Sequence, residues 1–302
     1  MEEEVNPSPA QEEEETAGAL AYPFAVVVDN LAAARPQSGL EGAAVVVEGL
    51  AEGGITRYFA VFTHDPGTAI GPVRSARIYF NRLAHLWGLP VAHVGGNKDA
   101  LEDWNRYPAY DIDDIRRGGG AFYRIQDRKA PHSTYTTAER VQKVLAGRSL
   151  PPAQLEFSRG PLPEGGEPVA GVELSYRQAK QVYRVEWHYE EGEWRRYLDG
   201  KSDRSADGVV LTAANVLVMV APVRPKEDPW TAGAIDIDFE HPRKAWLLRE
   251  GVVTACRVEW TANGLRLTSL LPAGSDLPLS RGNLWIQWVK EEGDVAWLDS
   301  NG

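Results

Sequence analysis

Cysteine is almost absent from this chain. Cys256 is the single cysteine among 302 residues, so neither an intrachain disulfide nor a cysteine-based metal site can form. A lone thiol in an apolar stretch usually packs as a small hydrophobic group, and we expect Cys256 to be buried. No close pair with metal-ligand spacing occurs among the histidines, and we expect no metal and no cofactor. They are His64, His85, His93, His132, His188 and His241.

Long apolar runs and familiar catalytic motifs are missing as well. No apolar segment approaches the roughly 20 residues that cross a bilayer. The sequence contains no serine nucleophile elbow and no dinucleotide-binding fingerprint. Gly118-Gly119-Gly120 follows Arg116-Arg117 without the strand and the Lys-Ser/Thr pair of a phosphate-binding loop. An enzymatic activity would therefore have to come from residues dispersed along the chain.

The net charge of −11 is unevenly distributed. Residues 1–22 are rich in glutamate and carry −7, residues 23–150 carry +2, and the remainder carries −6. The overall acidity argues against nucleic-acid binding, whereas the first half leaves room for a local basic cleft. We expect residues 1–22 to be a disordered acidic tether, because they hold too little apolar surface to fold.

Residues 23–150 have the pattern of an α/β domain. Apolar strands are predicted at Pro23–Val28, Ala43–Leu50, Tyr58–Phe62 and Pro90–Val94, with a hairpin at Gly53-Gly54. We expect a helix at 76–87 with Ser75 as its N-cap, and one at 98–104 capped by Asn97. A third helix is expected at 137–146, opened by a Thr136/Glu139 capping box.

Arginines cluster in the turns of this half. Ile70–Arg77 places Arg74 and Arg77 at the mouth of the predicted helix, where free backbone N–H groups and guanidiniums favour an anion. Both could equally pair with internal carboxylates. We expect Arg57 and either Arg74 or Arg77 to be buried, each held by Asp29, Glu48, Glu52 or a bound anion.

Acid and base groups accompany these arginines. Glu48 interrupts an apolar strand, so it must have a partner or a shifted pKa. If the protein is an enzyme, the acid and base candidates are Glu48, Glu52, His93 and His132. A histidine such as His93 is more often a satisfied core residue than a base.

From residue 151 onward the pattern is mainly β. A Pro/Gly-rich stretch at 160–168 separates the halves, and hairpin signals occur at Glu191-Gly192, Glu250-Gly251 and Asn263-Gly264. Strands are predicted at 171–176, 182–189, 193–198, 216–220, 234–239, 244–249, 252–260, 265–269 and 284–290. Eight of the ten tryptophans lie in this half, and alternating aromatics in strands are usually core.

Several motifs in order resemble a known family. They are Pro23–Asn30, Arg35–Leu40, Glu52–Arg57, Gly71–Arg77 and Arg128–His132, with weaker similarity at 211–218, 234–238 and 283–289. Together they resemble the YerB-like lipoprotein family of Gram-positive bacteria, in which a domain of unknown function precedes a second, separately named domain. The resemblance implies a two-domain α+β protein, extracytoplasmic and lipid-anchored, but no reaction. Such proteins usually begin with an export signal and a lipid-modified cysteine; this sequence begins Met1-Glu2, and we expect a chain trimmed after its anchor, attached to the membrane only through that anchor.

We therefore expect residues 1–22 to be a tether, 23–150 an N-terminal α/β domain with an arginine-lined cleft, and 151–302 a mainly β domain. The leading hypothesis is binding of an anionic cell-envelope component. The alternatives are a hydrolase or transferase acting on an anionic envelope substrate, and a module that binds an envelope protein. The expected ligand-binding residues are Asp29, Asn30, Arg35, Gln37, Ser38, Glu52, Thr56, Arg57, Arg74, Ser75, Arg77, Arg128 and His132.

Overall fold

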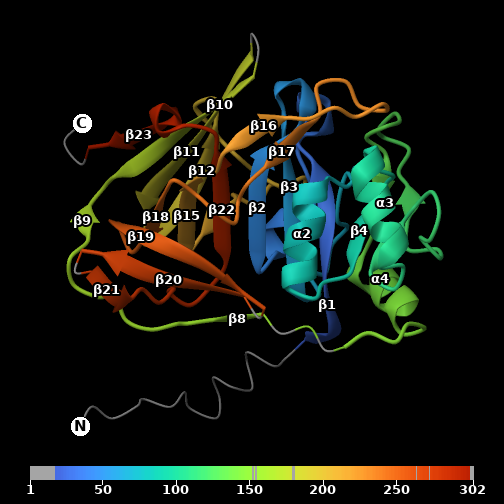
Figure 1. Ribbon diagram of the computed structural model, residues 1–302, viewed down its shortest axis with the longest axis horizontal. Helices are drawn as coiled ribbons and strands as arrows, with labels where there is room; N and C mark the ends of the chain where they lie inside the picture. Colours follow the sequence, from blue (N-terminus) through green and yellow to red (C-terminus); the bar gives the residue numbers. More distant parts are fainter. Residues whose placement is uncertain are drawn as a thin grey trace.

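One large mixed sheet runs through both halves of the chain. The computed structural model describes residues 18–299 except 152, 154, 179, 180, 263 and 272. The strands of this sheet follow the order β21-β20-β19-β18-β15-β22-β2-β3-β1-β4-β5, and β8 and β9 pair with β20 and β19 (Figure 1). A second sheet has the order β13-β12-β11-β10-β23, with β14 beside β12. The fold is thus α+β and mainly β.

The N-terminal strands are β1 (Ala19–Asp29), β2 (Val45–Leu50), β3 (Thr56–His64), β4 (Val91–His93), β5 (Asp111–Asp113), β6 (Tyr123–Arg124) and β7 (Thr134–Tyr135). The helices are α2 (Ile78–Leu86), α3 (Lys98–Arg106) and α4 (Ala138–Leu145), with 3-10 turns at Ala32–Ala34, Leu40–Gly42, Glu52–Gly54 and Glu292–Asp294. Figure 1 shows the helices gathered at one end of the large sheet. No described helix is long and apolar enough to cross a membrane.

The C-terminal strands are β8 (Glu156–Phe157), β9 (Glu167–Pro168), β10 (Gly171–Gln178), β11 (Gln181–Glu190), β12 (Glu193–Leu198), β13 (Lys201–Ser202), β14 (Thr212–Ala213), β15 (Asn215–Val220), β16 (Val223–Pro225), β17 (Ile235–Ile237), β18 (Lys244–Arg249), β19 (Val252–Thr261), β20 (Gly264–Leu270), β21 (Ala273–Asp276), β22 (Leu284–Val289) and β23 (Val295–Leu298). The predicted turns at Glu191-Gly192 and Glu250-Gly251 do join antiparallel neighbours, and all four residues have positive φ. Of the Asn263-Gly264 turn, Asn263 lies outside the described residues.

The two halves are joined by β22, which pairs in parallel with both β2 and β15. Alternate side chains of β22 point to opposite faces of the large sheet. Trp285 packs edge-on against Trp187 of the second sheet, whereas Trp288 stacks on Phe80 of α2. The domain boundary expected near residue 151 does not divide the large sheet, because that sheet contains strands from both sides of this position.

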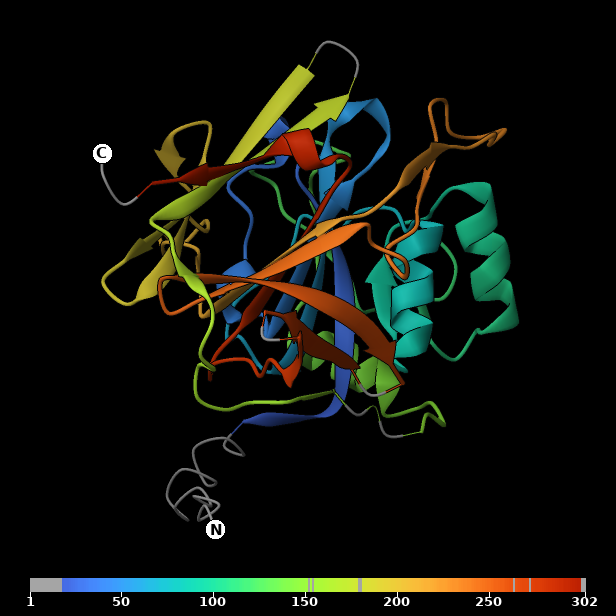
Figure 2. The ribbon, with the colours of Figure 1, turned by 60° about the vertical axis from the view of Figure 1, so that its left-hand side comes forward.

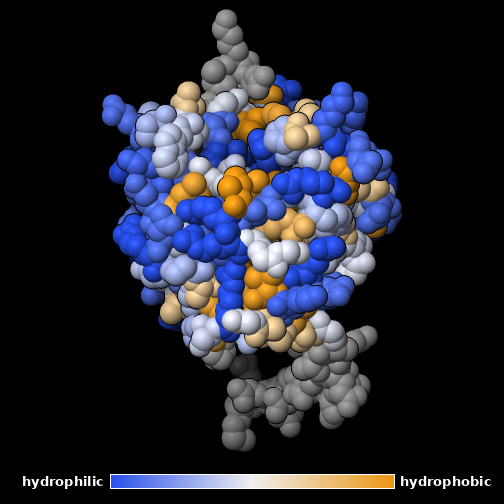
Figure 3. All heavy atoms as spheres, turned by 90° about the vertical axis from the view of Figure 1, so that its right-hand side faces the viewer, coloured by the Kyte–Doolittle hydropathy of each residue, from blue (hydrophilic) through white to orange (hydrophobic). Residues whose placement is uncertain are grey.

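A hairpin arm from the C-terminal half reaches over the N-terminal helices. Strands β16 and β17 pair only with each other among the described strands, and the arm they form lies beside α2 and α3 (Figure 2). Arg82 of α2 pairs with Asp236, and Lys226 pairs with Asp99 of α3. The face that α3 and α4 turn to solvent is mostly hydrophilic, with small apolar areas between hydrophilic ones (Figure 3).

Several local predictions need correction. Strand β1 begins at Ala19, which pairs with His64, so the last residues of the expected tether are part of the sheet; residues 1–17 lie outside the described chain. Helix α2 starts at Ile78, because Arg77 is still extended and forms the N-cap; the carbonyl of Ser75 instead accepts guanidinium N–H groups from Arg57 and Arg77.

The capping of the other two helices also differs from expectation. Thr137, not Thr136, caps α4: its side chain accepts from the backbone N–H of Arg140, while buried Thr136 donates to the carbonyl of Ala121. Asn97 does precede α3, yet its side chain makes no capping hydrogen bond. Capping patterns therefore located these helices to within two residues, but the tertiary contacts of neighbouring side chains set the first residue.

Candidate functional site

The carboxyl end of β1 carries two polar residues that point to opposite faces of the sheet. Asp29 and Asn30 are both buried, and Gln37 ties them together by donating to the carbonyl of Asp29 and to Oδ1 of Asn30. Arg35 also donates to Asn30, through Nε to Oδ1 at 3.0 Å and through Nη2 to the carbonyl at 2.9 Å. The turn at 35–39 therefore folds back onto the strand end.

Asp29 holds a guanidinium and an imidazole on one oxygen. Nδ1 of His132 lies 2.8 Å from Oδ2 of Asp29, and Nε of Arg74 lies 3.0 Å from the same atom. The other carboxylate oxygen accepts the backbone N–H of Leu31. Because the hydrogen-bonded imidazole and the ion-paired guanidinium approach one atom, these two groups are neighbours. Among the described residues, neither Nε2 of His132 nor the two Nη groups of Arg74 have a protein partner.

The exposure of these groups determines what they can do. Asp29 is fully buried, whereas His132 is 13 % exposed and Arg74 is 22 % exposed. These two partly exposed side chains can therefore reach a ligand, and the buried carboxylate holds the guanidinium and the imidazole in place. An imidazole whose Nδ1 is held by a carboxylate has its Nε2 free to accept or donate a proton.

Two of the predicted arginines serve a different carboxylate. Arg57 and Arg77 both donate to Glu52, with Nη2 of Arg57 2.8 Å from Oε1 and Nε of Arg77 2.8 Å from Oε2. Burial raises the pKa of Glu52, but the charges of Arg57 and Arg77 more than offset this and lower it to about 2. Burial, together with the charge of Arg77, lowers the pKa of Arg57 to about 10. The prediction that Arg57 and Arg74 or Arg77 are held by Asp29, Glu48 or Glu52 is confirmed.

The arginines around the end of β1 outnumber the carboxylates that they contact. Glu52 faces two guanidiniums, and Arg74 is close enough to Arg57 to lower its pKa. Arg128 adds another: its Nη2 donates to the carbonyl of Pro36 at 2.5 Å, and its buried Nη1 has no partner among the described residues. Such an excess of partly unpaired donors favours an anionic ligand.

On the opposite face, Asn30 belongs to a buried network around Glu48. Oε1 of Glu48 accepts from Thr56 at 2.6 Å, from Tyr183 at 3.2 Å and from Asn30 at 3.1 Å. Oε2 accepts from Nη2 of Arg196 at 2.8 Å, and Arg196 also pairs with Asp203. The expected partner of Glu48 is therefore an arginine from the C-terminal half. Burial by itself lowers the pKa of Arg196. The negative charge of Glu48 and the smaller effects of Tyr183, Tyr58 and Asp203 outweigh burial and raise this pKa well above its usual value.

A cavity of about 440 Å³ opens beside this network. Its polar lining includes Asn30, Arg35, Thr56, Tyr183 and Asp199, and the guanidinium of Arg35 stacks over the ring of Tyr183 at 4.7 Å. Asn30, Arg35 and Thr56 thus lie on a cavity, whereas Arg74 and His132 lie on the other side of the strand end. The predicted arginines do not converge on one cleft: four of them form separate sets around Asp29, Asn30 and Glu52, and Arg128 contacts the carbonyl of Pro36.

The remaining predicted residues have structural contacts. Ser38 is buried and exchanges backbone hydrogen bonds with Gly71, and the carbonyl of Ser75 accepts from Arg57 and Arg77. His93 is fully buried; its Nδ1 contacts the carbonyl of Gly95 and its Nε2 contacts Asp111, as expected for a satisfied core histidine.

His93, Asp111 and Asp113 are nevertheless the kind of group that can hold a metal, which the sequence spacing did not suggest. Their ligand atoms are already used. Arg116 and Arg117 donate to the two aspartates, and Oδ1 of Asp113 accepts two backbone N–H groups. A cation there would have to displace guanidiniums, so these residues fit a closed ion-pair network better than a metal site.

Sequence reasoning missed the C-terminal contribution to the network, namely Tyr183, Arg196 and Asp203. One signal was available for Arg196. It stands two residues after Trp194 in β12, so strand alternation puts the two side chains on the same face, and Trp194 is the type of residue that faces a core. No spacing in the sequence connects it to Glu48, 148 residues earlier.

The fold and the site thus define an α+β protein with a charged site at the end of a buried strand, and comparisons with known proteins agree. Residues 9–151 match the family described as "Protein of unknown function (DUF3048) N-terminal domain", and residues 172–286 match its C-terminal domain. The chain belongs to this family. It is 30 % identical over 285 residues to "Putative lipoprotein YerB" of Bacillus subtilis (strain 168), covering 89 % of this chain and 81 % of that protein. The crystal structure of YerB from Bacillus subtilis superposes with a TM-score of 0.82 at 27 % identity, covering 93 % of this chain and 95 % of that one.

Proposed function

We propose that this protein is an extracytoplasmic, lipid-anchored binding protein that holds an anionic group of the cell envelope at Arg74 and His132. The observation that carries the proposal is their shared contact with Oδ2 of buried Asp29, which leaves the Nη atoms of Arg74 and Nε2 of His132 unpaired on two partly exposed side chains. The name of the Bacillus relative supports the location. A phosphate or carboxylate oxygen suits these donors, because a guanidinium and an imidazolium both bind anions through N–H groups.

Calorimetric titration with inorganic phosphate, glycerol 3-phosphate and acetate tests this. Arg74→Gln and His132→Gln should each weaken phosphate binding about tenfold or more, the loss expected for one charge-assisted hydrogen bond. Arg106→Gln is the matched control, because Arg106 is exposed at the end of α3 and should bind phosphate like the parent protein. If both site variants retain full affinity, the anion does not bind here.

A second candidate function is acid–base catalysis on an anionic envelope substrate by a hydrolase or transferase. The Asp29–His132 pair favours it, since a buried carboxylate orients the imidazole with Nε2 outward. His132→Gln should then abolish turnover of phosphodiester, glycan or peptide substrates while a phosphate ligand still binds through Arg74. If purified protein turns over none of these substrate classes, binding alone remains the better account.

A further inference from the structure

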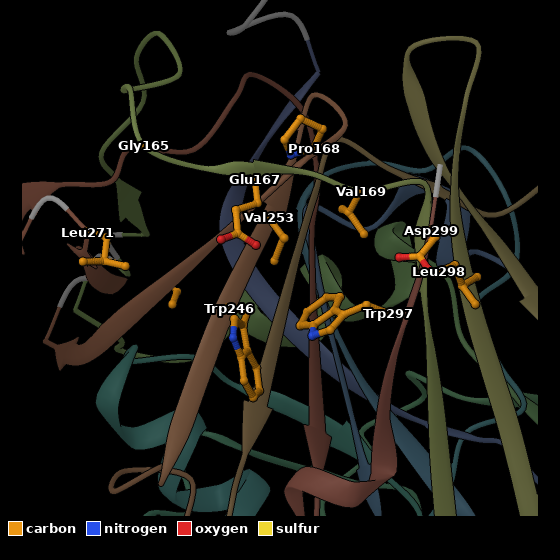
Figure 4. Close-up of a pocket in the computed structure, with 11 residues that line it drawn as sticks. Gly165, Glu167, Pro168, Val169, Trp246, Val253, Leu271, Trp297, Leu298 and Asp299 are labelled. Carbon is orange, nitrogen blue, oxygen red and sulfur yellow. The ribbon is translucent and has the colours of Figure 1, made fainter. Parts of the chain in front are cut away.

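A second cavity, of about 420 Å³, lies where the two sheets meet. It is far from the candidate site at the carboxyl end of β1. Trp246 of β18 and Trp297 of β23 form its walls, and β9 crosses above them with Glu167 (Figure 4). Strand β23 belongs to the second sheet and β18 to the large one, so the cavity exists only because the two sheets pack together.

The two tryptophans form an aromatic corner. Their ring centroids are 5.6 Å apart and their planes meet at 75°. Trp297 is 37 % exposed, unlike Trp187, Trp194 and Trp285, which are buried in the core. Indole faces carry negative potential and attract cations more strongly than any other side-chain ring. The corner thus offers ring faces to a small group that enters from solvent.

The charges that line this cavity are all negative. Glu167 and Asp299 are its charged residues, and in the described part of the chain neither carboxylate has a hydrogen-bonding or ion-pair partner. Beyond Trp246, the adjoining groove carries three cationic side chains, Arg243, Lys244 and Arg257, against one carboxylate, Glu240. The indole of Trp246 therefore separates an acidic compartment from one with a net positive charge, and a cation is favoured on the side of Glu167.

We propose that this cavity binds an organic cation, a quaternary or protonated ammonium group that carries apolar substituents. The methyl or methylene groups would pack on Trp246 and Trp297, while Glu167 and Asp299 supply the counter-charge. A neutral sugar could stack on the same rings, but it would leave both carboxylates without a counter-charge. The cavity volume is within the range of small-ligand sites.

The test uses choline and its neutral isostere 3,3-dimethylbutanol. Choline chloride replaces sodium chloride at constant ionic strength, and the indole N–H resonances of Trp246 and Trp297 are followed by NMR. Choline should shift both resonances saturably and the isostere should not. Glu167→Gln should weaken choline binding several-fold, and Trp297→Leu about tenfold, as expected for loss of a partly desolvated cation–π contact.

Trp230→Leu is the control, because Trp230 is 64 % exposed on the β16–β17 arm, outside the cavity. Glu167 is an exposed side chain of β9, so its amide variant keeps the fold and isolates the effect of charge. Equal binding of choline and the isostere, binding of neutral sugars in place of choline, or saturable shifts that survive Glu167→Gln unchanged would each overturn the proposal.

Discussion

Arg196 of β12 donates from Nη2 to Oε2 of Glu48 in β2 at 2.8 Å, with both side chains fully buried. This contact joins the second sheet to the middle of the large one. Its guanidinium also lies over the rings of Tyr58 and Trp285, at 5.6 Å and 5.3 Å. A charged pair therefore sits between two aromatic-rich sheets, where an unmatched charge is costly.

Arg196→Met should destabilise the protein by about 3 to 5 kcal/mol, because it leaves the Glu48 carboxylate buried without a counter-charge. Urea unfolding followed by circular dichroism measures this. Arg195→Met is the matched control: Arg195 is 30 % exposed and pairs with surface glutamates, so its loss should cost less than about 1 kcal/mol. The double variant Glu48→Met/Arg196→Met should recover much of the stability. If Arg196→Met and Arg195→Met lower the free energy of unfolding by similar amounts, the buried Arg196–Glu48 pair contributes no more than a surface ion pair.

Acid should remove the contribution of Glu52. Its pKa falls from an unfolded value of 4.5 to about 2, so the pairing with Arg57 and Arg77 stabilises the fold above pH 4.5 and is lost as the pH falls through about 2. This difference corresponds to about 3 kcal/mol. Unfolding free energies of the parent protein and of Glu52→Gln, measured from pH 7 to pH 2, should differ by that amount at neutral pH and converge in acid. A constant difference across this range would contradict the pKa.

Chelation should leave the melting temperature unchanged. The donor atoms of His93, Asp111 and Asp113 are occupied by Arg116, Arg117 and backbone groups, so no bound cation is needed to balance them. Differential scanning calorimetry with EDTA, and with added zinc or calcium, tests this. Stabilisation by a metal that disappears in a His93→Gln variant would show that the network opens to hold one.

Cys256 should react slowly in the folded protein. Burial raises the pKa of its thiol to about 12, and the thiolate is the reactive form. Labelling with a thiol reagent at pH 8 should follow global unfolding, with a rate that rises with urea in parallel with the loss of secondary structure. Rapid labelling without denaturant would indicate local opening of β19.

Local features of this fold follow from the sequence because they depend on neighbours along the chain. The apolar run at 24–28 predicts a buried strand, and β1 contains it with these residues fully inaccessible. Two hairpins follow from Glu-Gly pairs, because the turn needs positive φ at both positions. Pairing of the buried arginines with carboxylates also follows, since an uncompensated buried charge does not persist.

The sequence by itself determined which side chains had to find partners; the tertiary structure alone decided which partners these are. Glu48 required a counter-charge wherever it was buried, yet only the parallel pairing of β22 with β2 brings the C-terminal half, and with it Arg196, to that position. The same assembly divides the predicted arginines between Asp29, Asn30 and Glu52 and builds the Trp246–Trp297 corner between the sheets. Strand order is set by burial and packing among residues distant in the chain, which no local pattern records.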